Sequence, residues 1–225
     1  EHFYMPQVEA QEDFLRKYKG NQAAEELIEE KGQDNITVRE VANRAGYNIA
    51  TLYNYFENIN HLILFTSIKH LNNYVIDLPK CIYNAKTPMD RFYNSWKCFC
   101  HHAFAHPEVF HMIFFGNLSR EVVENSLQLY YELFPDSLEK VDDDFLDMMT
   151  CSDFVTRNMK TFQLITLPET SVVPSDQKLL FYSQLTSLIF QSMLYNAIEK
   201  EKAGTLSIEE ETDTFFMYLK KILEN

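Results

Sequence analysis

The stretch from Ile36 to Phe65 constrains the fold of this chain more than any other part of its sequence. Thr37 and Glu40 have the spacing of a capping box, in which each side chain bonds the other residue's backbone N–H and starts a helix. Gly46 suits the left-handed conformation that ends a helix, and Asn48 can cap the next one. Apolar residues recur at helical spacing in both segments, at Val38, Val41, Ala42 and Ala45 and at Ile49, Leu52, Tyr53 and Phe56. The pattern predicts two short helices joined by a tight turn, which is a helix-turn-helix.

A longer ordered string runs through this motif. The residues T-V-R-E-V-A-x-x-A-G-Y-N-x-A-T-L-Y-x-Y-F, from Thr37 to Phe56, resemble the helix-turn-helix signature of the tetracycline-repressor (TetR) family. The end of that family's first helix is matched by Ala23, Ala24, Leu27, Ile28 and Gly32, and an early leucine of its fourth helix by Leu62. The resemblance covers residues 20–65. It implies a three-helix DNA-binding head that places the second motif helix in the major groove.

The family's pattern places the DNA contacts on the second motif helix and its flanks. Asparagine can pair bidentately with adenine, while Ala50 and the methyl group of Thr51 can touch a thymine methyl. Tyrosine hydroxyls and the backbone N–H groups of the helix start can bond phosphates. Phe56, in contrast, is expected to pack inside the head. The predicted DNA-binding residues are Lys17, Thr37, Arg39, Asn48, Ala50, Thr51, Tyr53, Asn54, Tyr55 and His61.

Three features depart from an ordinary DNA-binding head. The net charge of −13 gives no general basic footprint. Ile59 stands where the family usually has a phosphate-contacting lysine, and Gly20-Asn21 stand where it usually has aliphatic residues. We therefore expect few phosphate contacts and a modest salt dependence. The alternative is a module of the same fold that binds a small molecule and has lost or weak specific DNA binding.

Composition places the chain in a broad class. Its 225 residues include few glycines and prolines, 5 and 7, and the long periodic stretches favour an all-α protein. No apolar run approaches the roughly 18 residues of a membrane span, so no membrane partner is expected. The acidic start lacks the pattern of a signal peptide, and the four cysteines form no CxxC pair, so we expect a cytoplasmic protein with reduced thiols. The sequence has no Gly-rich phosphate loop, GxSxG or HExxH motif, so neither enzymatic activity nor a cofactor is expected.

The resemblance implies a DNA-binding head over residues 10–65 and an effector-binding and dimerisation body over 66–225. The first helix is expected at about 12–31, and the fourth at about 59–78, ended by Pro79. Further helices are expected near 88–105, 107–115, 118–134, 138–165, 175–203 and 207–224. The run of aspartates at 142–144 is expected on a solvated helix face, and 166–175 as a flexible connection.

The body is rich in aromatic residues. Most of the 18 Phe, 13 Tyr and one Trp follow residue 80. Each is more often a core residue than a ligand contact, but the family's body usually binds a small effector, and such cavities are mainly apolar. The residues expected to line the effector cavity are Phe92, Trp96, Phe99, Phe114, Tyr130, Phe154 and Phe162. Nearby acidic residues, Asp90, Glu108 and Asp153, would favour a cationic or amphipathic effector.

The last two predicted helices are apolar over more than half of their circumference. Such helices must bury both sides. The resemblance implies that they pair with the same helices of a second subunit in a four-helix bundle, and a two-fold DNA reader needs that partner to reach its second half-site. The alternative is burial of both sides within one monomer.

A second motif weighs against this interpretation of the body. Cys98, His102 and His106 lie at i, i+4 and i+8 and share one helical face, with a spacing and chemistry that can hold zinc. Pro107 is expected to end the helix and to leave His106 in a turn, so no metal site is the main expectation.

Taken with its resemblance to the TetR family, the sequence predicts a ligand-responsive transcriptional repressor. We expect it to bind a pseudo-palindromic double-stranded DNA operator as a homodimer and to be released by a small-molecule effector. A metal-dependent enzyme remains as a distant alternative.

Overall fold

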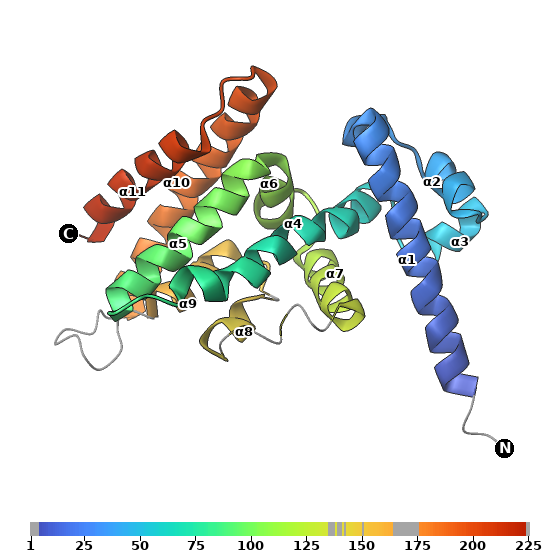
Figure 1. Cartoon of the computed structure of the whole chain (residues 1–225), viewed down its shortest axis with the longest axis horizontal. Coiled ribbons are helices and arrows are strands. Elements are labelled where there is room, and N and C mark those ends of the chain that lie inside the picture. Colours follow the sequence, from blue (N-terminus) through green and yellow to red (C-terminus); the bar gives the residue numbers. More distant parts are fainter. Residues whose placement is uncertain are drawn as a thin grey trace. The chain divides into compact units, whose positions relative to one another are not determined.

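The computed structural model describes residues 5–134, 138, 141, 143–149, 151–163 and 176–223. Within these residues the secondary structure is helical and contains no strand (Figure 1), which confirms the predicted all-α class. The chain divides into two compact units, Glu1–Ile68 and Lys69–Asn225, called here the head and the body. The functional domains predicted at 10–65 and 66–225 stay a prediction. The expected connection at 166–175 and the side chains of the aspartate run lie outside the described residues.

The head contains α1 (Met5–Lys31), the short 3-10 helix η1 (Gln33–Asn35), α2 (Val38–Ala45), α3 (Ile49–Tyr53) and the first part of α4 (Ile59–Ile82). Its small core is formed by side chains from all four α-helices. Its buried side chains include Ala24, Leu27, Val41, Ala42, Leu52, Leu62 and Phe65. The predicted helix-turn-helix is therefore present and is held against α1 and α4.

Local capping explains where the two motif helices begin and end. The Thr37 hydroxyl accepts from the Glu40 N–H at 3.3 Å, and a Glu40 carboxylate oxygen accepts from the Thr37 N–H at 3.0 Å, which completes the predicted capping box. Gly46 ends α2 in the left-handed conformation with a φ of 76°, and Asn48 caps α3 as predicted. The apolar pattern continues to Phe56, yet α3 ends at Tyr53, and Phe56 instead packs its buried ring against Phe65.

Gly20 lies in the interior of α1, where glycine costs about 1 kcal/mol relative to alanine. A Cβ at this position would stand 3.1 Å from Leu52 Cδ2 and 3.8 Å from the Phe56 ring. The missing side chain thus allows α1 to approach the core side of α3. The tertiary contact gives a physical reason for a residue that departs from the family's usual aliphatic choice.

The prediction that Pro79 ends the fourth helix is wrong. The helix α4 continues through Pro79 to Ile82. Proline removes one backbone hydrogen bond, but Leu78 and Ile82 on either side of it are buried, and Lys80 pairs with Asp77 at 2.6 Å. Packing of this last turn against the body therefore offsets the missing bond.

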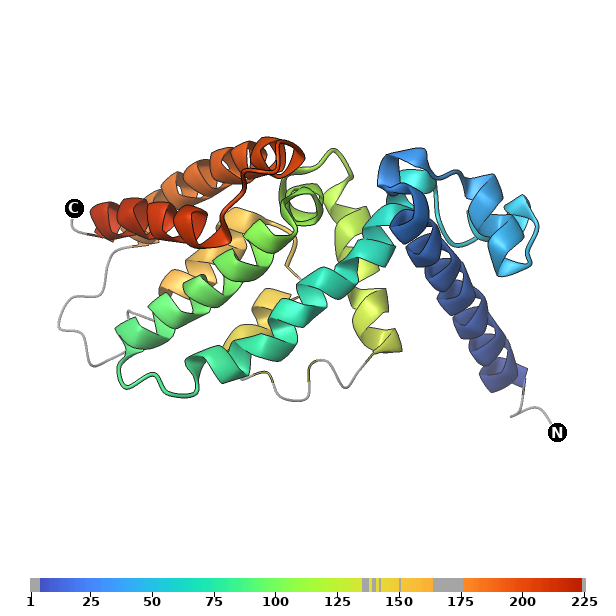
Figure 2. The same cartoon turned by 45° about the horizontal axis from the view of Figure 1, so that its top comes forward.

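Most of the body helices match the predicted ranges. They are α5 (Pro88–Ala105), α6 (Pro107–Phe115), α7 (Arg120–Leu133), α10 (Asp176–Lys202) and α11 (Ile208–Leu223). Helices α10 and α11 run side by side, and α5 lies beside α11 (Figures 1 and 2). An aromatic cluster fills the space between these helices and α9, with Trp96 at 4.8 Å from Phe215 and Phe154 stacked on Phe190 at 5.4 Å between ring centroids.

The single helix expected over 138–165 is wrong, because two helices occupy this range, α8 (Asp143–Met149) and α9 (Phe154–Gln163). Asp153 starts the second one: its carboxylate accepts from the Thr156 N–H at 3.1 Å. Ser152 in turn donates its hydroxyl to Glu124 at 3.0 Å. Both side chains stabilise a break in the helix, and Ser-Asp before an apolar run was a recognisable N-cap signal.

Candidate functional site

The second motif helix, α3, exposes small polar and aromatic side chains on one side. Tyr53 is 53% exposed, and Ala50 and Asn54 are exposed as well. Leu52 is buried in the head. A short helix with one packed and one open face is the arrangement that major-groove reading requires.

The cap of α3 uses two of the predicted contact residues. The Asn48 carboxamide oxygen accepts from the Thr51 N–H at 2.8 Å and from the Thr51 hydroxyl at 3.0 Å. Bidentate pairing with adenine needs a carboxamide oxygen as acceptor, so adenine recognition by Asn48 competes with the cap. Thr51 keeps its methyl group for apolar contact. Asn54, exposed at the other end of α3, is the asparagine better suited to adenine.

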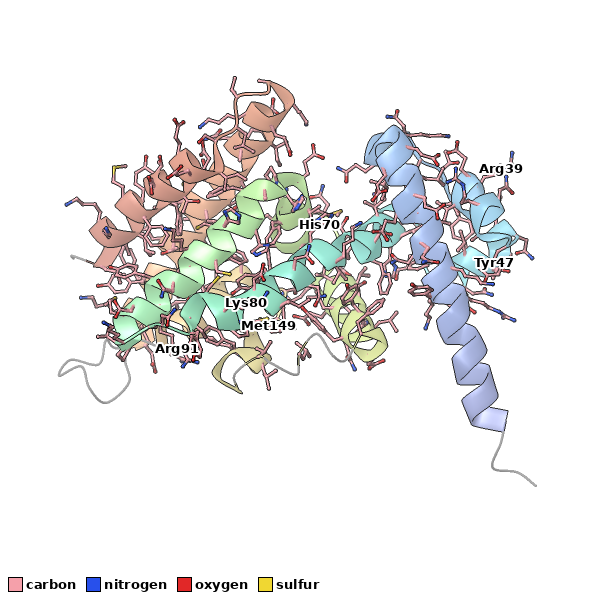
Figure 3. All side chains as sticks on the ribbon, viewed as in Figure 1. Arg39, Tyr47, His70, Lys80, Arg91 and Met149 are labelled. Atoms are coloured by element: carbon pink, nitrogen blue, oxygen red, sulfur yellow. The ribbon has the colours of Figure 1, made fainter. Side chains whose placement is uncertain are left out.

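Ion pairs between α1 and α2 involve two basic residues of the head. The Arg44 guanidinium bonds Glu30 at 2.9 Å and Glu26 at 3.2 Å, and Lys31 contacts Glu40 at 2.6 Å. Arg39 is exposed on α2, with Tyr47 in the turn that follows (Figure 3). The pairs join α1 to α2 and reduce the positive charge open to phosphates.

The remaining predicted contacts flank α3. The Lys17 ammonium lies 5.4 Å from the centroid of the half-buried Tyr55 ring. Thr37 is exposed but uses its hydroxyl in the cap of α2. His61 Nδ1 accepts from the Glu57 N–H at 3.3 Å, and burial lowers the pKa of this imidazole. His61 is therefore neutral at pH 7, which makes it a weak substitute for the lysine that Ile59 replaces.

A cavity lies inside the body between α4, α5, α8 and α9. It is lined by Tyr74, Ser95, Trp96, Phe99, Met148, Phe154, Arg157, Asn158 and Thr161. About 20 Å³ of this space is open to a water-sized atom, which is room for about one water molecule. Ligand sites usually occupy roughly 300 Å³ or more, so a small-molecule effector would have to move the lining side chains or helices apart.

Arg157 supplies the charge of this cavity. It is 3% exposed, and its guanidinium lies 5.3, 5.8 and 5.9 Å from the ring centroids of Phe114, Tyr74 and Phe99. Its Nη1 donates to the Met148 carbonyl, while its Nη2 is buried without a hydrogen-bond partner. Burial also raises the pKa of Tyr74, partly offset by Arg157, so this phenol stays neutral.

The predicted effector residues divide into two groups. Trp96, Phe99 and Phe154 line the cavity, and Phe114 stacks over Arg157 beside it. The other three are packed elsewhere in the body: Phe92 against Phe162 at 5.2 Å, and Tyr130 against Phe134 at 4.8 Å.

The acidic residues expected to attract a cationic effector have other partners. Asp90 caps α5, Glu108 contacts Lys202 at 3.4 Å, and Asp153 contacts Arg120 at 2.9 Å. The charged residue that lines the cavity is positive, so the expectation of a cationic effector is not supported.

Arg157 was missed from the sequence, although a signal was present. With α9 starting at Phe154, positions 154, 157, 158, 161 and 162 fall on one helical stripe, and all five are buried. An arginine and an asparagine on such a stripe are the polar groups of an otherwise apolar wall. The stripe was missed because the helix was expected to begin at residue 138, whereas α9 begins at Phe154.

The residues of the alternative metal site are engaged separately. Cys98 is buried, His102 contacts Asp77 at 3.3 Å, and His106 ends α5 with its ring 3.9 Å from that of His70. Across the described part of the chain, no group of three or more His, Cys, Asp or Glu side chains is arranged to hold a metal ion. All four cysteines are free thiols.

One face of α10 remains apolar and open. Phe181, Leu188 and Tyr195 recur every seven residues and are each more than half exposed, while Tyr182 and Met193 of the same helix are buried. Met217 and Tyr218 are exposed on the neighbouring helix α11. A seven-residue apolar repeat is the pattern of a helix that packs along another helix.

Comparison with known proteins identifies the head. Residues 22–64 match the sequence model of a family described as bacterial regulatory proteins, tetR family. This segment contains the C-terminal part of α1, all of α2 and α3, and the start of α4. A comparison with curated proteins gives no significant match. None of the described helices is long and apolar enough to cross a membrane.

Solved structures share the fold of the chain. One is a TetR transcriptional regulator from Rhodococcus sp. RHA1, with a TM-score of 0.55 and 17% identity over 94% of this chain and 97% of that one. Another is FadR of Thermus thermophilus, a TetR family transcriptional repressor in complex with lauroyl-CoA, with a TM-score of 0.56 and 15% identity over 90% and 92%. The fold is that of these helix-turn-helix transcriptional regulators. Residues 22–64 carry the N-terminal domain of the tetR family.

Proposed function

We propose that the protein is a transcriptional repressor that binds a two-fold symmetric DNA operator as a homodimer and is released by a small-molecule effector. The observation that carries this proposal is the head: an N-capped motif helix with Ala50, Tyr53 and Asn54 on its open face. The methyl groups of Ala50 and Thr51 suit thymine, and the Asn54 carboxamide suits adenine. Arg39, Lys17 and the Tyr53 and Tyr55 hydroxyls are the proposed phosphate contacts.

The open apolar face of α10 supports the homodimer. Exposed Phe181, Leu188 and Tyr195 would be covered by the same residues of a second copy, since a two-fold interface is self-complementary. Exchange of Leu188 for Glu places a charge in this seam, and we expect it to yield monomers in analytical ultracentrifugation. The matched control is Ile76→Glu, at an exposed apolar position of α4, which should leave the dimer intact.

Helix α4 is the proposed connection between ligand and DNA. It is continuous from Ile59, six residues past α3, to Ile82, and its Tyr74 lines the cavity of the body. An effector that separates the cavity walls would displace Tyr74 and with it α4. A coupling free energy of about 1–3 kcal/mol would change operator affinity by several-fold to about a hundredfold. The lauroyl-CoA in the Thermus thermophilus structure supports a small-molecule site in this fold.

The proposal is tested by selecting bound sequences from a random DNA pool with the purified full-length protein at low salt. We expect a two-fold symmetric motif whose enrichment is lost in Tyr53→Ala. The matched control is Tyr83→Ala, since Tyr83 is 84% exposed in the body and stands outside the head. Enrichment that survives Tyr53→Ala would contradict the assigned role of α3.

A second candidate function is a small-molecule-binding module of this fold without specific DNA binding. The ion pairs of Arg44 and Lys31, together with Ile59 in place of a lysine, favour it, because they leave few cations for phosphates. A folded dimer that enriches no sequence, while the body still binds a ligand, would support this candidate over the repressor.

A further inference from the structure

The guanidinium of Arg157 has no ion-pair partner among the described residues, although it is almost fully buried. An unpaired charge inside a protein is costly, because it loses its hydration without gaining a counter-charge. The rings of Phe114, Tyr74 and Phe99 and the Met148 carbonyl replace part of that hydration. They do not neutralise the charge. Among the described residues, the cavity therefore contains a cation without a counter-charge.

Two hydrogen-bond donors of this cavity are also unused. Arg157 Nη2 and Trp96 Nε1 are both buried without a partner, and both residues line the cavity. Both side chains lie beside the Phe99 ring, whose centroid is 5.9 Å from the guanidinium carbon and 5.8 Å from the Trp96 ring centroid. Neither group can accept a hydrogen bond. The missing partner must therefore be an acceptor, and the charge of Arg157 selects a negative one.

We propose that this cavity binds an organic monocarboxylate, with its carboxylate on Arg157 and Trp96 and its apolar body among Phe99, Phe154 and Met148. The assignment rests on the proposed function only in treating that carboxylate as the effector. A single carboxylate matches the single positive charge. A phosphate dianion would leave surplus negative charge in an aromatic wall that offers few donors.

Arg157 also has a structural contact, because its bond to the Met148 carbonyl joins α9 to α8. A purely structural arginine would affect folding but would not distinguish ligands by their head group. Trp96 provides a direct readout of the site, since it is the one tryptophan of the chain and lines the cavity. Its fluorescence reports on the surroundings of this one side chain, which include the cavity.

The test titrates the full-length protein with matched probes while following Trp96 fluorescence and the melting temperature. The probes are decanoate, decanol and decylamine, and 3-phenylpropionate, 3-phenylpropanol and 3-phenylpropylamine. We expect at least one carboxylate to change the fluorescence and raise the melting temperature, and to bind roughly tenfold or more tightly than its alcohol, given the strength of hydrogen bonds to charged groups. The amines should bind least, since like charge repels them from Arg157.

Two variants connect binding to Arg157. Arg157→Met keeps an unbranched side chain and removes the guanidinium and its charge, and we expect it to abolish the preference for the carboxylate over the alcohol. The matched control, Arg120→Met, removes an arginine whose side chain is largely exposed and should leave the preference unchanged. Far-UV circular dichroism checks that each variant is folded. If Arg157→Met does not fold, Trp96→Phe, followed by calorimetry, should weaken carboxylate binding several-fold.

The outcomes separate this inference from the proposed function. Failure of both carboxylates to bind, equal binding of alcohol and carboxylate, or unchanged preference in Arg157→Met would each overturn the carboxylate site. Binding of decanoyl-coenzyme A without decanoate would overturn it in favour of a phosphate-bearing ligand. Selection of an operator in the same preparation, with no carboxylate binding, would leave the repressor intact. Carboxylate binding by a protein that selects no DNA would leave the site intact and contradict the repressor.

Discussion

The head and the body build their candidate sites in opposite ways. In the head, the predicted DNA contacts come mainly from one segment, residues 37–61, and lie largely on an exposed surface. In the body, the cavity gathers Tyr74, Trp96, Met148 and Arg157 from four helices and buries them almost completely. A contact surface needs exposed groups on a short rigid scaffold, whereas a ligand cavity needs distant walls. The head is therefore governed by local capping and the body by long-range packing.

The substitution with the largest expected effect on this comparison lies in the buried core of the head. Leu52→Ala removes a buried side chain beneath Gly20, and we expect a loss of about 2–5 kcal/mol in the unfolding free energy of the head. Hydrogen exchange should show faster exchange in α1–α3 and unchanged protection in α10. The control Tyr83→Ala trims a side chain that is 84% exposed in the body and should change folding stability by less than about 0.5 kcal/mol. Equal loss of protection in both units would show that they unfold together.

Gly20 tests how closely α1 must approach α3. Gly20→Leu gains helix propensity but meets Leu52 and Phe56, so we expect a net destabilisation of about 1–3 kcal/mol and weaker DNA binding. Chemical denaturation and operator titration measure the two effects. Gln22→Leu, at an exposed position of the same helix, is the control for adding a leucine to α1. A Gly20→Leu variant that is more stable than the wild type would show that Leu52 and Phe56 move aside easily for the new side chain.

The two units contain equivalent capping boxes, Thr37 with Glu40 in the head and Thr87 with Asp90 in the body. Thr37→Ala and Thr87→Ala should each cost about 1 kcal/mol of stability. Only the first should reduce operator affinity, because it loosens the helix that supports α3. Denaturation and DNA titration of both variants compare them directly. A similar loss of affinity in Thr87→Ala would contradict the separation of roles.

The smallest expected effect is a difference in pH dependence. Burial lowers the pKa of His70 from 6.5 to about 4, with His106 and Lys69 acting in the same direction. Since the unfolded chain binds this proton more readily, the body should lose stability as the pH falls from 6.5 to about 4. In the head, bonds to Arg44 and Lys31 lower the pKa values of Glu30 and Glu40. Their contribution is complete above pH 4.5 and is lost only as the pH falls below it.

Hydrogen exchange at pH 7 and pH 5 measures the two units separately. We expect protection to fall more in the body, where burial lowers the pKa of His70, His102, His106 and His111, than in the head, where it lowers that of His61. His70→Gln should reduce the response of the body, because the shift of His70 is the largest of these, and Glu30→Gln should leave that response unchanged. If the pH response of the body persists in full in His70→Gln, another titrating group causes it.

The sequence alone determined the helix-turn-helix, its caps at Thr37, Gly46 and Asn48, and most helix ranges of the body. These features depend on hydrogen bonds and apolar spacing within a few residues, which a sequence displays directly. It also indicated aromatic residues of the body, of which Trp96, Phe99 and Phe154 line the cavity.

Only the tertiary structure decided the rest. The reason for Gly20, the continuation of α4 through Pro79 and the break between α8 and α9 all depend on neighbours that are distant in the chain or on competition between local caps and helix. The isolation of Arg157 depends on which side chains surround it from four helices. Spacing along one helix can place a charge on a buried face, but only packing shows whether another side chain neutralises it.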